Sequence, residues 1–255
     1  MLRARHVIAI IIAVLVAVAY FLLQSSTQWL VPGTDIISAL ASGICSIIAF
    51  LIVDRWGSES RFGIVHIGMF LGVFFWFLGD ITWVVYETIL HFAIPYPSFA
   101  DVFYLAGYVP IAVGMVQFLR IFHSSLSRKR AVAALLMGLL SFACTLLLVI
   151  GPLTISSEEL LTKMFDVAYP ALDSLLVLLA FLMVFIFRGG KMSGSWVWIA
   201  FGLLLNALAD ILFSLGTLQG WYYSGHPIEL VQIWAYICLG VGFYEQIYFY
   251  EQLRL

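Results

Sequence analysis

The sequence has few charged residues, and this scarcity excludes an ordinary soluble domain. Asp, Glu, Lys and Arg make up 10% of the 255 residues, against 64% hydrophobic residues, and the mean hydropathy is +1.08. An average soluble domain has about 25% charged residues. Apolar stretches of about 20 residues, long enough to cross bilayer hydrocarbon, recur along the whole chain. We therefore predict an all-α, polytopic membrane bundle, with residues 1–255 forming one integral membrane domain.

Other absences exclude several classes of membrane protein. The three cysteines all lie in apolar stretches, so we expect no disulfide framework. No lysine lies deep in a late span, as a retinal Schiff base requires, and no span carries the arginine series of a voltage sensor. The histidines are poorly placed for paired haem ligation, and no spacing predicts a zinc site. No basic stripe indicates nucleic acid, and we expect no cofactor or metal.

The hydropathy pattern and the placement of basic residues agree on eight spans. The expected spans are roughly 7–23, 35–53, 63–90, 100–122, 131–150, 164–187, 196–218 and 228–250. Eleven of the 12 lysines and arginines fall at the N-terminus, in the even-numbered connections or at the C-terminus, and only Lys163 lies on the other side. The positive-inside rule then places both termini in the cytoplasm of a cell-membrane protein. We expect the first span to be retained rather than cleaved as a signal peptide.

The two halves of the chain resemble each other. The segment Phe77–Ile81 of the third span matches Ala207–Ile211 of the seventh, 130 residues later, and both contain an aspartate. Gly72 and Gly202 are separated by the same offset. We predict two parallel four-span repeats, approximately residues 1–125 and 126–255, related by an axis along the membrane normal.

Carboxylates on apolar helices are the strongest functional signal. An ionised carboxylate in hydrocarbon costs several kcal/mol, so such side chains are expected to face the bundle interior or a hydrated cavity. They recur at helical spacing with aromatic and amide residues, as in Trp76, Asp80, Trp83 and Glu87 of the third span. The predicted ligand-binding residues are Asp80, Asp210, Asp173, Glu87, Asp101, Asp166, Glu229, Trp76, Trp83, Tyr104, Tyr108, Tyr169, Asn206 and Tyr236.

Some of these carboxylates have a purely structural interpretation. Ser98–Asp101 has the form of a capping box, and Glu229 follows Pro227 in a first helical turn, where negative charge is favourable. Asp166 and Asp35 also lie near expected helix starts. Capping does not explain Asp80, Asp173 and Asp210, which lie inside their spans. For these three, interhelical hydrogen bonds remain the alternative to a ligand, ion or proton site.

Several motifs resemble the multi-span N-terminal sensor module of bacterial and archaeal diguanylate cyclases and histidine kinases. They are Pro95–Tyr108 preceded by Gly79 and Asp80, then Asp166–Asp173, and Ala209–Phe213 followed by the Gly-Trp-Tyr-Tyr turn at residues 220–223. The resemblance extends over most of the chain after Arg61, and it implies a sensory input module. The family's cyclase or kinase domain does not follow here, so the expected output is through a separate cytoplasmic partner.

Three functions compete. The leading hypothesis is a sensor or receptor whose acidic, aromatic-lined, outward-facing pocket binds a small cation or amine-bearing ligand. The alternative is a small-solute or proton-coupled transporter that uses Asp80 and Asp210. A membrane hydrolase resembling lysoplasmalogenase is the third, because eight spans with Gly-Asp in the third are similar to that family. No serine or histidine nucleophile accompanies the acids, so the sequence favours a role without catalysis.

Overall fold

Eight long apolar helices make up most of the part of the chain that the structure describes. The computed structural model describes residues 4–57, 60–122, 126–151, 159–186 and 193–254, and no strand occurs in these ranges. All eight helices are long and apolar enough to cross a membrane, which supports a membrane helical bundle. The elements are α1 (Ala4–Leu23), α2 (Leu30–Trp56), α3 (Arg61–Trp83) with the π-helical η1 (Val84–Ile89), α4 (Phe99–Phe122), α5 (Arg128–Thr145) with the π-helical η3 (Leu146–Ile150), α7 (Leu160–Ile186), α8 (Ser193–Gln219) and α9 (Glu229–Arg254).

Two helices begin four or five residues earlier than the sequence predicted. We expected the second span to begin at Asp35, but α2 begins at Leu30 and contains Pro32 in its first turn. Proline is tolerated there because the first N–H groups of a helix have no partner within that helix. α7 begins at Leu160, before the predicted residue 164. Both differences place the aspartates of these helices inside the helix rather than at its start.

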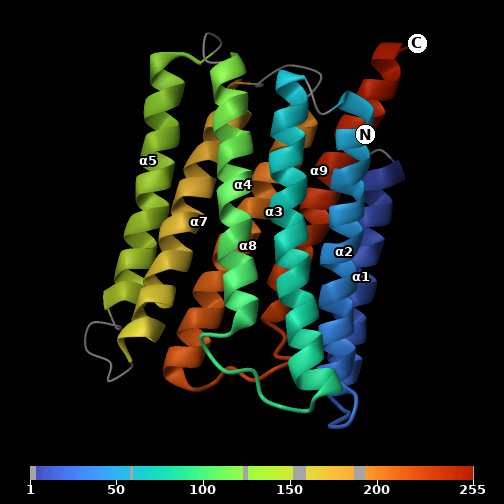
Figure 1. The fold of residues 1–255 in the computed structure, drawn as a ribbon, viewed down its shortest axis with the longest axis vertical. Coiled ribbons are helices and arrows are strands. Elements are labelled where there is room, and N and C mark those ends of the chain that lie inside the picture. The colour runs from blue at the N-terminus through green and yellow to red at the C-terminus, as the bar shows by residue number, and fades with distance from the viewer. Residues whose placement is uncertain (1–3, 58–59, 123–125, 152–158, 187–192, 255) are drawn as a thin grey trace.

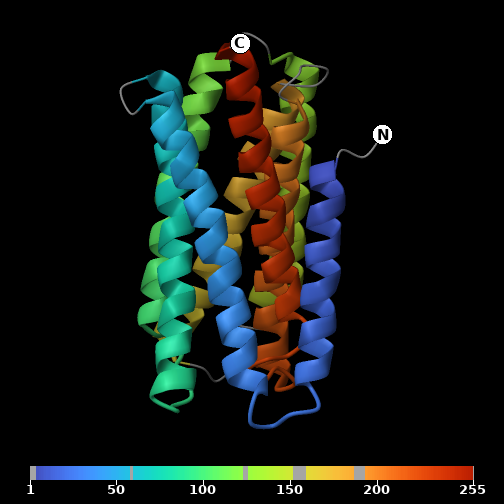
Figure 2. The same cartoon turned by 90° about the vertical axis from the view of Figure 1, so that its right-hand side faces the viewer.

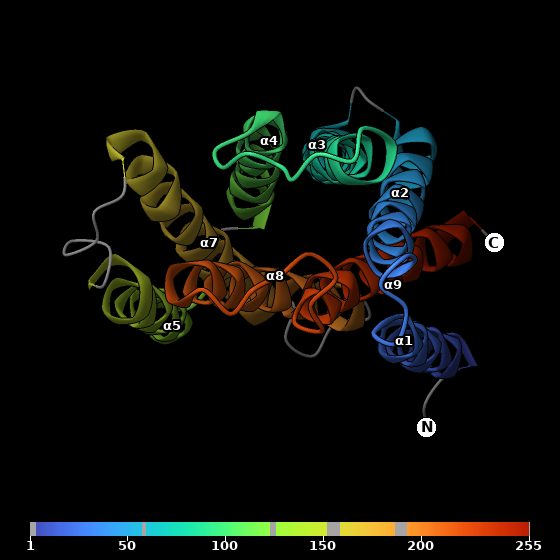
Figure 3. The ribbon, with the colours of Figure 1, turned by 90° about the horizontal axis from the view of Figure 1, so that it is seen from below.

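Six of the helices form a ring. Each helix contacts the next in the order α2, α3, α4, α7, α8 and α9, and α9 contacts α2, which closes the ring. α1 packs outside the ring on α9, and α5 packs outside it on α7 (Figure 3). The helices run along the long axis of the molecule, and both ends of the chain lie at the same end of the bundle (Figure 1). The ring therefore has a terminal end, near the N- and C-termini, and an opposite end.

The ring is filled with large side chains toward its terminal end. Met115, Phe118, Trp196 and Phe243 come from three helices and are almost fully buried there in one apolar core. The rings of Phe118 and Trp196 have centroids only 4.4 Å apart. This packing closes the interior of the ring toward the terminal end.

The peripheral helix α1 lies beside α9 (Figure 2), and polar contacts near both of its ends hold it there. Near the termini, Arg5 donates to Glu245 with a nitrogen–oxygen distance of 2.7 Å, and its guanidinium lies 4.3 Å from the ring centre of Tyr248. At the opposite end, the Tyr20 hydroxyl donates to Glu229 at 3.0 Å. These bonds compensate for the small apolar contact of α1, whose side chains are mostly exposed.

α3 and α4 approach each other closely at glycines. A Cβ atom on Gly68 would collide with the Pro110 carbonyl oxygen and would lie 2.9 Å from the Cα atom of Gly114. A Cβ atom on Gly72 would lie 2.7 Å from the Gly107 carbonyl oxygen. Small residues at such crossings let two backbones pack directly, which is a main source of association between helices in membranes. The contact fixes α4, and thus its tyrosines, against α3.

We expect Gly68→Ala to lower the thermal stability of the purified protein. Alanine is favoured over glycine in a helix by about 1 kcal/mol. The collision is with backbone atoms that have little room to move, and overpacking of this kind costs about 1–3 kcal/mol, so the net effect is destabilising. The measurement is Tm in detergent. Gly194→Ala is the control, because a Cβ there meets nothing within 4 Å; equal or higher stability of Gly68→Ala would contradict this account of the crossing.

Candidate functional site

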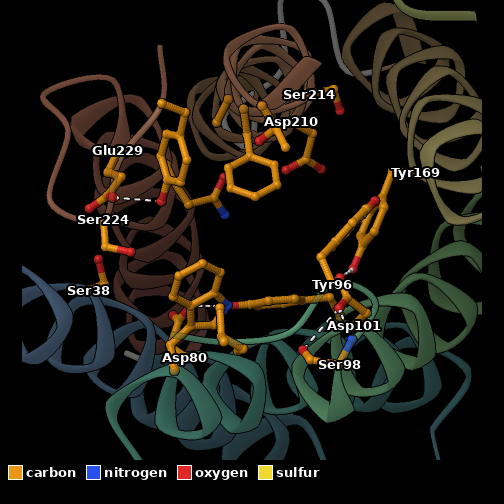
Figure 4. A pocket seen from close by; sticks show the side chains of 18 of the residues that line it. Ser38, Asp80, Tyr96, Ser98, Asp101, Tyr169, Asp210, Ser214, Ser224 and Glu229 are labelled. Atoms are coloured by element: carbon orange, nitrogen blue, oxygen red, sulfur yellow. Dashed lines mark hydrogen bonds between the residues drawn. The ribbon is translucent and has the colours of Figure 1, made fainter. Parts of the chain in front are cut away.

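A cavity of about 420 Å³ lies inside the ring at the end opposite the termini. Its wall is made by α2, α3, α4, α7, α8 and α9, and by the connections before α4 and before α9. Six carboxyl side chains line it, and its lining contains no Lys, Arg or His. Figure 4 shows Asp80, Asp101, Asp210 and Glu229 on different sides of this space rather than at one point. The six are Asp35, Asp80, Glu87, Asp101, Asp210 and Glu229.

Most of the residues that the sequence singled out meet at this cavity. Asp173 and Asp166 do not line it, and each is bonded to a tyrosine that does: Asp173 to Tyr108 and Asp166 to Tyr96. The stripe on α3 continues to face the cavity through the π-helical turn. The lining residues among those predicted are Trp76, Asp80, Trp83, Glu87, Asp101, Tyr104, Tyr108, Tyr169, Asn206, Asp210, Glu229 and Tyr236.

Tyrosine hydroxyls are the main donors to the buried carboxyl groups. Tyr104 of α4 donates to Asp80 of α3 at 2.7 Å. Tyr169 of α7 donates to Asp101 at 2.8 Å, and Tyr96 donates to Asp166 at 2.6 Å. Hydrogen bonds to charged groups contribute about 1.5–3 kcal/mol each, and a buried group without one costs a similar amount. The tyrosines thus make an acidic interior tolerable in a protein that has almost no cations there.

One hydroxyl group joins two carboxyl groups at the side of the cavity. The Tyr108 oxygen lies 2.8 Å from Asp173 Oδ1 and 2.9 Å from Asp210 Oδ2. Asn206 also donates to Asp173, at 3.2 Å. A hydroxyl has one proton to donate, so it can donate to only one of the carboxyls. The second contact is a hydrogen bond only when the other carboxyl carries a proton, and the trio Asp173–Tyr108–Asp210 is therefore built to hold a proton.

Of the four carboxyl groups with a capping interpretation, two accept hydrogen bonds at helix starts and two lie inside their helices. The Asp101 side chain accepts from the Ser98 backbone N–H at 2.6 Å, and Ser98 Oγ accepts from the Ala100 N–H at 3.1 Å, so the capping box is confirmed. Glu229 accepts from the Gly225 N–H at 2.7 Å at the start of α9. Capping is wrong for Asp166 and Asp35. Both lie inside helices, and Asp35 accepts from the Thr88 hydroxyl at 2.9 Å.

Some lining residues were not among the predicted ligands. Asp35 was set aside as a cap because α2 was expected to begin there. Gln232 lies on the same face of α9 as Glu229 and Tyr236, and this spacing was a usable signal. Tyr96, Tyr222 and Ser224 belong to connections that fold over the cavity, and no periodicity in the sequence places such residues. Ser224 donates to Glu87 at 2.8 Å, which joins the connection before α9 to η1.

The titratable groups in these connections add donors but no positive charge. Burial raises the pKa of the Tyr96 hydroxyl. Burial, and to a smaller extent the negative charge of the nearby Glu229, raises the pKa of the Tyr222 hydroxyl. Both hydroxyls stay protonated and donate, Tyr96 to Asp166 and Tyr222 to Glu229. Partial burial lowers the pKa of His226, so this histidine is neutral at pH 7. The lining of the cavity therefore has no basic side chain to balance the acids.

Comparison with protein-family models, with curated proteins and with solved structures finds no match to this chain. The likeness to sensor modules remains an expectation from sequence, and function is argued from the cavity itself.

We expect Tyr108→Phe to destabilise the protein by about 1–3 kcal/mol, the cost of leaving buried polar groups unpaired. The measurement is Tm in detergent, with Tyr244→Phe as the control because Tyr244 is exposed.

A double-mutant cycle with Asp173→Asn tests the proton-sharing arrangement directly. The side-chain amide of Asn at position 173 brings its own N–H donor to Asp210. The double variant with Tyr108→Phe should therefore lose less stability than the sum of the two single losses. Coupling energies between contacting residues are about 0.5–3 kcal/mol. Strict additivity would show that Tyr108 does not link the two carboxyls.

Proposed function

We propose that this protein is a membrane receptor or sensor that binds a small organic cation, such as an amine, in the cavity and signals through a separate cytoplasmic partner. The single observation that supports this most is the lining, which has six carboxyl groups and no basic side chain. A bound cation would supply the positive charge that the wall lacks. The cavity volume lies within the range of about 300–1,000 Å³ that is common for small-molecule sites.

An organic cation suits this cavity better than a metal ion. Among the described residues, no group of three or more His, Cys, Asp or Glu side chains is placed to hold a metal. Aromatic side chains lie between the acids, and their faces attract ammonium groups by about 0.5–2 kcal/mol. The aromatic lining residues are Trp76, Trp83, Tyr96, Tyr104, Tyr108, Tyr169, Phe213, Tyr222, Tyr223 and Tyr236.

We infer that the cavity opens to the outside of the cell. Most of the basic residues lie at the terminal end of the ring, and basic residues favour the cytoplasmic side. They are Arg5, Arg55, Arg61, Arg120 and the run Arg128–Arg130. Arg3, Arg188 and Lys191 lie outside the described residues. Lys163, near the start of α7, lies at the end that holds the cavity. A ligand would then arrive from outside, while the partner would contact the terminal end.

This orientation predicts the labelling of single cysteines in a background without Cys45, Cys144 and Cys238. Ser25→Cys lies in the exposed connection between α1 and α2 and should react with a membrane-impermeant maleimide on intact cells. Lys129→Cys, exposed at the start of α5, should react only after the membrane is permeabilised. The reverse pattern would place the cavity in the cytoplasm and would remove the basis for an extracellular ligand.

A carrier remains the alternative, because the contacts of Tyr108 with Asp173 and Asp210 give the bundle a place for one proton between two carboxyl groups. The packing of Met115, Phe118, Trp196 and Phe243 between the cavity and the terminal end favours a receptor. A carrier would have to open this core in every cycle. Uptake of a radiolabelled amine into proteoliposomes above the level of empty vesicles would favour the carrier over the receptor.

Equivalent contacts support the predicted internal repeat. Gly72 meets the Gly107 carbonyl oxygen and Ile111, whereas Gly202 meets the Ala235 carbonyl oxygen and Leu239. The two contacted residues are four positions apart in both halves. The acids follow the same relation, as Tyr108 of the first half bonds to Asp210 of the second, and Tyr236 lies close to Asp80. A pseudo-twofold axis through the ring would generate this arrangement, in which a tyrosine of each half approaches an aspartate of the other half.

Asp80→Asn should weaken amine binding by tenfold or more. The change keeps the shape of the side chain and removes its charge, and a charge-assisted hydrogen bond contributes about 1.5–3 kcal/mol, where 1.4 kcal/mol is tenfold in affinity. The readout is the rise in Tm of the purified protein, titrated with a panel of primary and quaternary amines.

The matched control is Asp54→Asn, since Asp54 is exposed near the terminal end of α2 and does not line the cavity. It should respond to amines as the unchanged protein does. A wild-type Tm that no amine in the panel shifts would refute the proposed function.

A further inference from the structure

Two acids on one helix each have a buried oxygen without a donor. Asp80 Oδ2 and Glu87 Oε2 have no hydrogen-bond partner among the described residues, although both side chains line the cavity. The acids on other walls are better satisfied: Glu229 accepts from Tyr20, Tyr222 and the Gly225 N–H. Unsatisfied buried acceptors are uncommon and call for a missing donor. Among the six carboxyl groups that line the cavity, the buried oxygens without a hydrogen-bond partner thus belong to Asp80 and Glu87.

The environment of Asp80 fits an ammonium group. Asp80 is 7% exposed and Tyr236 is 1% exposed. The Tyr236 hydroxyl and Gln232 Oε1 are also buried, both side chains line the cavity with Asp80, and the hydroxyl lies near both Asp80 and Gln232. The single Tyr236 proton can satisfy Asp80 or Gln232 but not both, whereas a primary ammonium has three N–H donors and can donate to all three oxygens. A quaternary ammonium has no N–H and would leave them unsatisfied.

The second free carboxyl oxygen lies farther along the same helix. Glu87 follows Asp80 by seven residues, which corresponds to about 10 Å at a rise of 1.5 Å per residue. Trp83 lies between them and also lines the cavity. Two carboxylates this far apart cannot share one metal ion, whose oxygen ligands lie at about 2.3–2.6 Å. They can bind two cationic groups that are joined by an apolar chain passing over the indole.

We propose that the ligand of this cavity is a linear diamine or polyamine, with one primary ammonium bound by Asp80 and a second cationic nitrogen bound by Glu87. This rests on the proposed function and narrows its substrate class. Charge-assisted contacts of about 2.8 Å at each end leave roughly 5–10 Å between the nitrogens along α3. That span corresponds to a chain of about four to seven methylenes. Joining the two ammonium groups makes the second contact intramolecular, so the diamine gains affinity over either half.

The experiment measures binding of α,ω-diamines with three to ten carbons, and of monoamines of equal length, to the purified full-length protein. Isothermal titration gives the affinities. Diamines of about four to seven carbons should bind at least tenfold more tightly than the matched monoamines. A flat dependence on chain length, or monoamines that bind as tightly as diamines, would overturn the proposal while leaving a general amine receptor intact. If neither class binds, both this proposal and the proposed function fail.

Glu87→Gln supplies the second arm. It should reduce diamine affinity to the monoamine level and leave monoamine affinity within about twofold, because a monoamine binds at Asp80 alone. Glu159→Gln is the matched control, since Glu159 is exposed at the same end of the molecule and does not line the cavity. A diamine preference that survives Glu87→Gln would contradict the assigned position of the second nitrogen.

Discussion

The hydrogen bond from a tyrosine hydroxyl to a buried carboxyl group is the interaction on which this structure depends. A bundle in lipid cannot leave several acids unsolvated, and this one has almost no cations near them to pair with. The tyrosines take the place of water. Because Tyr104, Tyr108 and Tyr169 bond to carboxyls on neighbouring helices, the bonds that solvate the acids also tie α3, α4, α7 and α8 together.

The two ends of the ring use different means to hold the same helices. Toward the termini, large apolar side chains fill the interior, and the glycines of α3 and α4 let those backbones meet directly. Toward the other end, the interior is hollow and the polar network replaces apolar packing. A hollow polar end costs stability relative to a filled one. The close α3–α4 crossing offsets part of that cost and fixes the position of α4.

The sequence was sufficient to predict the helices and the inward faces, but not the details of the site. Hydropathy and charge gave eight spans, and the spacing of Asp80 with Trp76, Trp83 and Glu87 correctly placed one face of α3 at the cavity. The roles of the individual acids depended on partners far away in the chain. Asp101 accepts from the Ser98 backbone N–H, as its capping-box motif predicted, but no motif could predict that Tyr108 bridges Asp210 to Asp173. The connections that cover the cavity, including Tyr96 and Ser224, follow no periodic rule.

The depth of Asp80 has an electrical consequence. This residue lies nine positions before the end of η1 at Ile89, or about 13 Å along the helix axis, in a hydrocarbon layer about 30 Å thick. In the proposed orientation, with the cavity open to the outside, a positively charged ligand that travels from the outer surface to Asp80 would cross part of the transmembrane field. One charge moved through the whole field gains about 2.3 kcal/mol per 100 mV, so occupancy of this carboxylate would rise several-fold in an energised cell and fall when the membrane depolarises.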